Sequence, residues 1–183
     1  MSEPARETFT TKEYLHLEQT SPIRHEFVAG YLYAMAGGSS QHARISLNIA
    51  SKFLGFSRGK NCRVYQEAMK FQYRHDVYYY PDVMLVCDKP LPDKFFENQP
   101  CVLVEVLSPS TRDTDLREKQ IAYTAISSVQ TYLVVETEKR SVRRFYRDEV
   151  NEWQSEELEM NGLINIPCLG ASLSLEEIYE GIL

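Results

Sequence analysis

The chain has 183 residues, 43% of them hydrophobic, and a formal net charge of −6 at pH 7. This length fits one compact domain over residues 1–183, and the acidic charge argues against a protein that coats nucleic acid by bulk charge. The longest apolar runs have only about the length of a strand, so no membrane-spanning helix is expected. The first residues, MSEPARETFTTKEY, contain no apolar segment, so no secretory signal is expected either.

The charges are distributed unevenly along the chain. Residues 44–74 contain seven Lys or Arg and one acid, Glu67, whereas residues 148–183 contain nine acids and no Lys or Arg. A basic stretch can contact phosphates even in an acidic chain. A solvated helix face followed by a loop explains the same residues, and the sequence alone slightly favours this second interpretation.

The four cysteines, Cys62, Cys87, Cys101 and Cys168, show no C-x-x-C spacing. Cys87 and Cys101 lie in apparent strands, where a reduced cysteine behaves as a small hydrophobic residue. The sequence therefore predicts a reduced, cytoplasmic protein without a zinc site.

The first predicted elements are a short helix and a hairpin. Residues 10–19 have the composition of a helix, with Thr10 or Thr11 as its N-cap. The segment HEFVAGYLYAMAG follows, and its alternation of apolar and polar residues on both sides of Ala29-Gly30 predicts two strands joined by a tight turn.

A longer helix and two strands come next. Ser39 or Ser40 can cap a helix over about 40–57, because apolar residues recur in it at spacings of three and four and form one face. These apolar residues are Ile45, Ile49, Phe53 and Phe56. Two further apolar segments, 62–73 and 77–87, are each expected to form one strand.

The second half of the chain contains a strand–helix–strand series. The apolar strand 101–107, a helix near 114–127 and the strand 131–137 have the right lengths for a crossover that joins two parallel strands. Exposed antiparallel strands are expected within 141–160, and a last short helix within 173–183. The predicted class is α/β: a mixed central sheet flanked by helices, with extra antiparallel strands toward the C-terminus.

Two carboxylates occupy positions where a charge is costly. Glu105 lies inside the apolar strand CVLVEVL with no Lys or Arg beside it, and Asp82 follows Pro81 at the start of another apolar strand. A buried, unpartnered carboxylate costs several kcal/mol. If the two strands pair, the acids can meet, and a divalent cation between them would remove their repulsion. Mg²⁺ commonly uses one or two protein carboxylates.

Lys119 is the third candidate residue. On the helix DLREKQIAYTAIS it shares the apolar face with Leu116, Tyr123 and Ile126, so its side chain is expected to point toward the sheet. It can there pair with the acids or touch a bound phosphate. The structural alternative is that Asp82 caps a turn and that Glu105 and Lys119 form a buried ion pair without catalytic function, or that Lys119 extends to the helix edge.

At these residues the sequence resembles a known family. The stretches RHEFVAGYLYAMAGGSSQH, YYYPDVMLVCD, VLVEVLSPSTRDTDLREKQIAY and VQTYLVVE are similar to the Uma-two family of restriction-endonuclease-like proteins, within the PD-(D/E)XK nuclease superfamily. They cover most of residues 24–137. The Pro81-Asp82 pair alone is a weak motif, whereas EVLSPST followed by D-x-x-x-K-x-x-x-Y is much more specific.

The resemblance assigns roles to individual residues. It implies that Asp82 and Glu105 bind the metal and that Glu26 matches a further acid of the pattern. His42 matches a histidine at the start of the first core helix. The usual lysine of the superfamily lies two residues after the second acid, where this chain has a leucine, and Lys119 on the following helix matches the relocated lysine of the Uma-two pattern.

The function that the resemblance implies is hydrolysis of phosphodiester bonds in DNA with the help of Mg²⁺ or Mn²⁺. Asp82, Glu105 and Lys119 would carry the chemistry. The alternative is a catalytically silent nuclease-like module that binds nucleic acid or protein, favoured by the net acidity and the missing lysine. A purely structural ion-pair cluster is the third hypothesis. The exposed strands within 141–160 are compatible with a homodimer.

Overall fold

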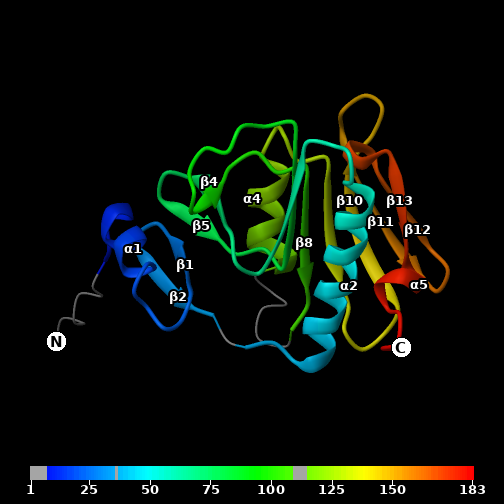
Figure 1. Ribbon diagram of the computed structural model, residues 1–183, viewed down its shortest axis with the longest axis horizontal. Helices are drawn as coiled ribbons and strands as arrows, with labels where there is room; N and C mark the ends of the chain where they lie inside the picture. The colour runs from blue at the N-terminus through cyan, green and yellow to red at the C-terminus, as the bar shows by residue number, and fades with distance from the viewer. Residues whose placement is uncertain (1–7, 36, 109–114) are drawn as a thin grey trace.

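The computed structural model describes residues 8–35, 37–108 and 115–183 (Figure 1). Its centre is a six-stranded mixed sheet. In spatial order the strands are β11 (Trp153–Glu159), β10 (Ser141–Arg147), β9 (Thr131–Val135), β8 (Val102–Val106), β6 (Val83–Cys87) and β3 (Cys62–Gln66). Only β8 and β9 are parallel within it, so the predicted crossover is confirmed. The crossover contains the π-helix η1 (Asp115–Lys119) and the helix α4 (Gln120–Thr124).

One face of this sheet is covered by the helix α2 (Ser40–Phe56). Ser39 caps the helix by accepting a hydrogen bond from the backbone N–H of His42. Ile45, Ile49 and Phe53 are fully buried in the core with residues of β6, β8 and β9, which confirms the predicted apolar face. The C-terminal elements complete this layer: β12 (Leu163–Ile166), η2 (Pro167–Leu169), β13 (Ala171–Ser174) and α5 (Leu175–Ile178).

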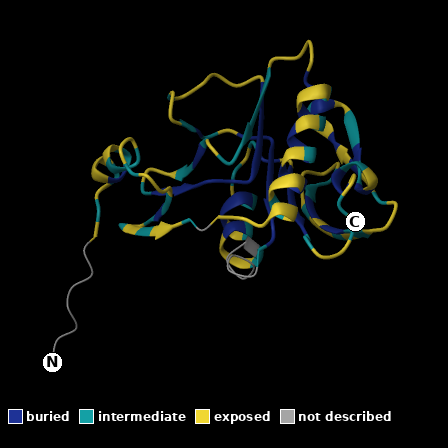
Figure 2. Ribbon diagram, turned by 60° about the horizontal axis from the view of Figure 1, so that its bottom comes forward, coloured by how far each residue is buried: buried dark blue, intermediate teal, exposed yellow. Residues whose placement is uncertain are grey.

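The opposite face packs against α4 and a second sheet (Figure 1). This five-stranded sheet has the order β2 (Tyr31–Ala34), β1 (His25–Val28), β5 (Val77–Tyr79), β4 (Lys70–Arg74) and β7 (Phe96–Glu97). The helix α1 (Thr11–Leu17) packs its Tyr14 onto β1 and β5. The buried strands lie inside, and α2 exposes only its outer side (Figure 2).

Two predicted strands are wrong in one respect: each divides between the two sheets. Residues 62–73 form β3 and β4, and residues 77–87 form β5 and β6. The breaks face each other. Glu67 has a left-handed backbone (φ 53°), its N–H binds the carbonyl of Asp82, and Pro81 has no N–H to offer a ladder. Both chain segments therefore leave one sheet and enter the other at the same place.

The prediction of reduced cysteines is also wrong. Disulfides join Cys62 to Cys87 and Cys101 to Cys168. Cys62 and Cys87 are direct partners in the β3–β6 register, which brings their side chains together. Such pairing depends on strand register and on the return of the C-terminal segment, and neither is visible in the spacing of the cysteines along the chain.

The remaining predicted elements differ mainly in their limits. The first helix, the hairpin, and the strands at 141–160 are present, with Thr10 as the cap of α1. The C-terminal helix is shorter than expected, because residues 171–174 form β13. Residues 1–7, 36 and 109–114, which include Ser110, lie outside the described part. Within the described residues, no helix is long and apolar enough to cross a membrane.

We predict that Phe53→Ala lowers the free energy of unfolding by about 3–5 kcal/mol, because it leaves a cavity under α2. Leu54→Ala is the matched control: Leu54 is 55% exposed on the same turn, and its loss should cost within about 0.5 kcal/mol. Urea denaturation of both variants measures the difference. Equal losses would contradict the assignment of the buried face.

Candidate active site at the junction of the two sheets

Glu105 lies on β8 and points toward α4. Along β8, Val104 and Val106 belong to the core on the α2 side, so the alternation of the strand places Glu105 on the other side. Glu105 is only 3% exposed. Its Oε1 accepts hydrogen bonds from Lys119 Nζ at 3.1 Å and from the Tyr123 hydroxyl at 2.7 Å. Buried hydrogen bonds of this kind offset the cost of removing a carboxylate from water.

Lys119 connects two carboxylates. It is 4% exposed, and its Nζ lies 3.1 Å from Glu105 Oε1 and 2.9 Å from Glu26 Oε1. The Tyr79 ring lies under the same ammonium, 5.8 Å from the ring centroid. Arg117 and Glu118 are exposed, so the predicted inward face of this helix is confirmed. The partner that Glu105 lacks on its own strand is supplied 14 residues later.

Asp82 lies at the start of β6, next to Glu105. The β6–β8 register pairs Val83 with Val104, and one further step places Asp82 beside Glu105. Asp82 Oδ2 accepts a hydrogen bond of 2.6 Å from the N–H of Val106. The two acid-bearing strands do pair, which meets the condition set by the sequence analysis, and the roles of the two acids stay predictions.

His42, in the first turn of α2, reaches Asp82 from the other layer. Its Nε2 lies 3.2 Å from Asp82 Oδ2. This hydrogen bond raises the pKa of the imidazole, and the charges of Asp82 and Glu67 act in the same direction, while burial opposes them. Gly38 leaves room for the ring, because a Cβ at that position would lie 2.7 Å from His42 Nδ1.

Glu67 is a site residue that the sequence does not reveal. Its carboxylate, the carboxylate of Asp82 and a ring nitrogen of His42 all lie within 4.8 Å of one another. In the sequence Glu67 is one acid inside a basic stretch and carries no motif. It joins the site because the extended segment is interrupted at Glu67, between β3 and β4. The backbone hydrogen bond from the N–H of Glu67 to the carbonyl of Asp82 fixes its position there.

The site thus consists of two adjoining groups. Lys119 holds Glu105 and Glu26 together, and Asp82 meets His42 and Glu67. Backbone contacts link the groups, since Asp82 binds the N–H that follows Glu105, and Glu26 accepts from the N–H of Tyr80 at 3.3 Å. Four carboxylates face one lysine and one histidine. This excess of negative charge fits a divalent cation.

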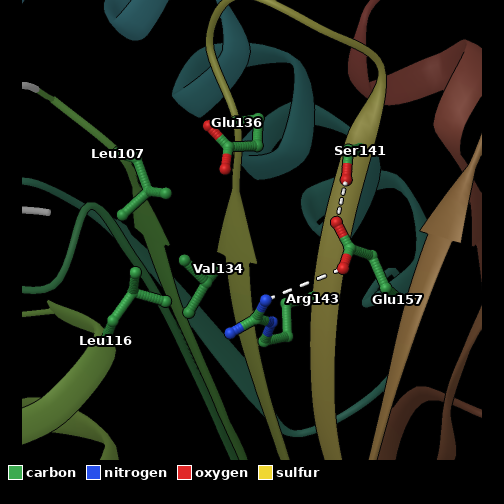
Figure 3. A pocket seen from close by; sticks show the side chains of 7 residues that line it. All are labelled: Leu107, Leu116, Val134, Glu136, Ser141, Arg143 and Glu157. Atoms are coloured by element: carbon green, nitrogen blue, oxygen red, sulfur yellow. Dashed lines mark hydrogen bonds and ion pairs between the residues drawn. The ribbon is translucent and has the colours of Figure 1, made fainter.

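Leu107 occupies the position of the usual superfamily lysine, and its side chain is buried in the apolar core. It lines a small cavity of about 20 Å³ with the side chains drawn in Figure 3. Leu116 and Val134 form its apolar side, and Arg143 pairs with Glu157 at 3.6 Å on the other. The cavity has room for about one water molecule. It is therefore too small for a nucleotide and is separate from the carboxylate site.

The basic stretch 44–74 does not form a continuous cationic surface. Most of its side chains bind partners within the chain: Arg44 binds the carbonyl of Gly181, Lys52 pairs with Glu177, Lys60 binds the carbonyl of Leu169, and Arg63 pairs with Glu97. Lys70 is buried against aromatic rings, which lowers its pKa. A cation near the carboxylates comes from Arg24, which is exposed and donates to the carbonyl of Glu67.

Comparison with known proteins decides the family. A model of the Uma2 family, described as "Putative restriction endonuclease", matches residues 11–176. The chain belongs to the Uma2 family. It is 30% identical over 173 residues to the "Uncharacterized protein slr1290" of Synechocystis sp. PCC 6803, covering 93% of this chain and 91% of that protein. A second protein of the same organism, sll1609, is 29% identical over 157 residues, with 81% and 86% covered.

A solved structure has the same fold as this Uma2 chain. It is described as a "putative nuclease belonging to DUF820" from Anabaena variabilis, and it superimposes with a TM-score of 0.77 at 16% identity, over 96% of this chain and 99% of that one. The predicted restriction-endonuclease-like fold is therefore confirmed. At this level of identity the likeness concerns the fold alone.

We predict that Lys119→Met lowers the free energy of unfolding by about 3–5 kcal/mol, because it leaves the Glu105 and Glu26 carboxylates buried without their shared cation. Arg117→Met removes the same charge from the exposed face of the same turn and should change stability by less than about 0.5 kcal/mol. Guanidinium denaturation distinguishes the two. A Lys119→Met protein as stable as Arg117→Met would exclude a structural ion triad.

We also predict that Asp82→Asn lowers the pKa of His42 in the metal-free protein, measured by NMR titration of its ring protons. Since the fold raises this pKa above about 6.5, the His42–Asp82 pair should stabilise the fold below that pH and lose its contribution as pH rises through the folded value. Asp148→Asn, in the turn between β10 and β11, is the control. An unchanged His42 pKa in Asp82→Asn would show that the hydrogen bond to Asp82 does not raise the pKa of the imidazole.

Proposed function

We propose that this Uma2 protein is a metal-dependent endonuclease that hydrolyses phosphodiester bonds of DNA. The observation that carries the proposal is the position of Asp82. Its carboxylate lies within 4.8 Å of the Glu67 carboxylate and a His42 ring nitrogen, and it accepts a hydrogen bond from the N–H of Val106, the residue that follows Glu105 on the neighbouring strand. Nuclease function in general is supported by membership of the Uma2 family, which is described as "Putative restriction endonuclease".

The donors that would hold the metal are Asp82 and Glu105, with Glu26, His42 and Glu67 next to them. Carboxylates suit Mg²⁺ and Mn²⁺, whereas imidazole is a common ligand of transition metals. The presence of His42 in the set therefore favours Mn²⁺ over Mg²⁺. When bound, such an ion would polarise the scissile phosphate and lower the pKa of a coordinated water.

The protein's own groups would perform the remaining work. Lys119 holds Glu105 and Glu26 in fixed positions through its ammonium group. An ammonium in this buried position stabilises developing negative charge more strongly than it would in water. The hydroxyl of Tyr123 donates to Glu105 Oε1 and so restricts the rotation of this carboxylate. Arg24 lies at the rim, where it can contact the backbone of a nucleic acid.

The second candidate function is binding without cleavage. It is favoured by Leu107, a buried leucine at the position on the second acidic strand where the superfamily usually has its lysine.

We predict that Glu105→Gln reduces nicking of supercoiled plasmid by at least about 100-fold at saturating Mn²⁺, because an amide removes one anionic ligand and weakens the hold of Lys119. Glu149→Gln makes the same change in the exposed β10–β11 turn and should leave the rate unchanged. Rates are measured over a series of Mn²⁺ and Mg²⁺ concentrations.

Measuring the retention of plasmid DNA in parallel distinguishes the endonuclease from the binding module. Metal-dependent nicking by wild type that Glu105→Gln lacks supports the endonuclease. Retention of DNA without nicking by either protein selects the binding module. Equal nicking by both proteins would contradict the assignment of Glu105.

A further inference from the structure

All four cysteines of the chain meet at one place, at the end of β6 and β8 opposite the carboxylates. Cys62 begins β3, Cys87 ends β6, Cys101 directly precedes β8 and Cys168 lies in η2. The sulfurs of Cys87, Cys101 and Cys168 lie within 4.8 Å of one another, and Cys62 is bonded to Cys87. These four sulfurs are called the sulfur cluster below.

Two disulfides do not require this convergence. Each could form at its own location, yet the two are in contact, and they draw residues separated by up to 106 positions onto one point. Three sulfurs of the sulfur cluster, those of Cys87, Cys101 and Cys168, are as close together as the ligands of a single ion, and the fourth, of Cys62, is bonded to one of them. A tetrahedral Zn²⁺ with Zn–S bonds of about 2.3 Å holds its ligands roughly 3.8 Å apart, inside the spacing seen here. An iron–sulfur cluster places several metal atoms between its cysteines and spaces them more widely.

The surroundings also suit thiolates. Cys87 and Cys101 are buried at 8% and 6% exposure within the α2-side core, which keeps competing water away. Lys60 lies two residues before Cys62 and donates to the carbonyl of Leu169, next to Cys168. A lysine in this neighbourhood adds a positive charge that offsets part of the negative charge of a tetrathiolate.

We propose that the reduced chain binds one Zn²⁺ through Cys62, Cys87, Cys101 and Cys168, and that the two disulfides are the oxidised, metal-free form of the same site. Reduction by a phosphine breaks both S–S bonds: each disulfide takes two electrons and two protons, and the phosphine becomes its oxide with oxygen from water. The four thiols then release four protons as Zn²⁺ binds. Hydrogen peroxide, which is reduced to water as it takes two electrons from each pair of thiolates, re-forms the disulfides and releases the ion.

This site would fasten the C-terminal layer to the sheet. Cys168 is the single ligand that comes from the β12–η2–β13 segment, whereas the other three come from the central sheet or its immediate approach. In the oxidised form the disulfide between Cys101 and Cys168 links this segment to the sheet, and in the reduced form the metal–sulfur bonds would do so. The fold is therefore expected to persist in both forms. The carboxylate site at the other end of β6 and β8 is chemically independent of it.

The test uses the full chain, reduced with a phosphine under anaerobic conditions, freed of reductant and titrated with Co²⁺ as a spectroscopic probe. We expect one equivalent of Co²⁺ to produce the intense visible bands of tetrahedral cobalt and a sulfur-to-metal charge-transfer band, and Zn²⁺ to remove both. Glu149→Gln, in the exposed turn between β10 and β11, should give the same spectrum. Cys168→Ser should lose the four-sulfur spectrum or bind Co²⁺ at least about 10-fold more weakly.

A second measurement on the wild-type chain does not depend on a variant that folds. Iodoacetamide should modify four cysteines in the reduced, metal-free protein and none after one equivalent of Zn²⁺, as counted by mass spectrometry, with modification restored by a chelator. The proposal is overturned if Zn²⁺ leaves the rate of alkylation unchanged, or if the reduced protein shows only the weak absorption of octahedral cobalt.

Discussion

The ammonium of Lys119, placed between Glu105 and Glu26, is the interaction on which the rest of the site depends. Three buried charges from β8, β1 and the crossover helix meet within 3.1 Å. Each carboxylate alone would be costly in the core, and the shared cation is what lets both remain there. Because the three elements belong to both sheets and to the helix between them, the ion triad also fixes how the two sheets meet.

That junction explains why the acids gather at one place. Two long extended segments are interrupted, one at Glu67 and the other at Asp82, and a backbone hydrogen bond joins these two residues. At Glu67 the chain passes from the central sheet to the smaller one, and at Asp82 it passes back, so the side chains at these two points lie at the junction of the sheets. Polar groups can therefore collect there without opening the core. Apolar side chains fill the core on both sides of the central sheet, and the polar site lies at the junction between the two sheets.

Local patterns predicted much of this. The helix face with Lys119 and the parallel crossover follow from periodicity and length, and the family resemblance pointed to Glu26 and His42. What failed depends on tertiary structure. Glu67 has no periodicity and enters the site only through a left-handed turn. The split strands look continuous because both halves are apolar. The cysteines gave no signal, since strand register and the returning C-terminal segment bring them together.

The central claim is that Asp82 and Glu105 form part of one divalent-cation site. Electron paramagnetic resonance of Mn²⁺ titrated into the protein without DNA tests it directly, because free and bound Mn²⁺ give different signals. The account predicts saturable binding by wild type and at least about 10-fold weaker binding by Asp82→Asn and by Glu105→Gln. Equal Mn²⁺ affinity in wild type and both variants would contradict it, and would reduce the carboxylates to a structural ion network.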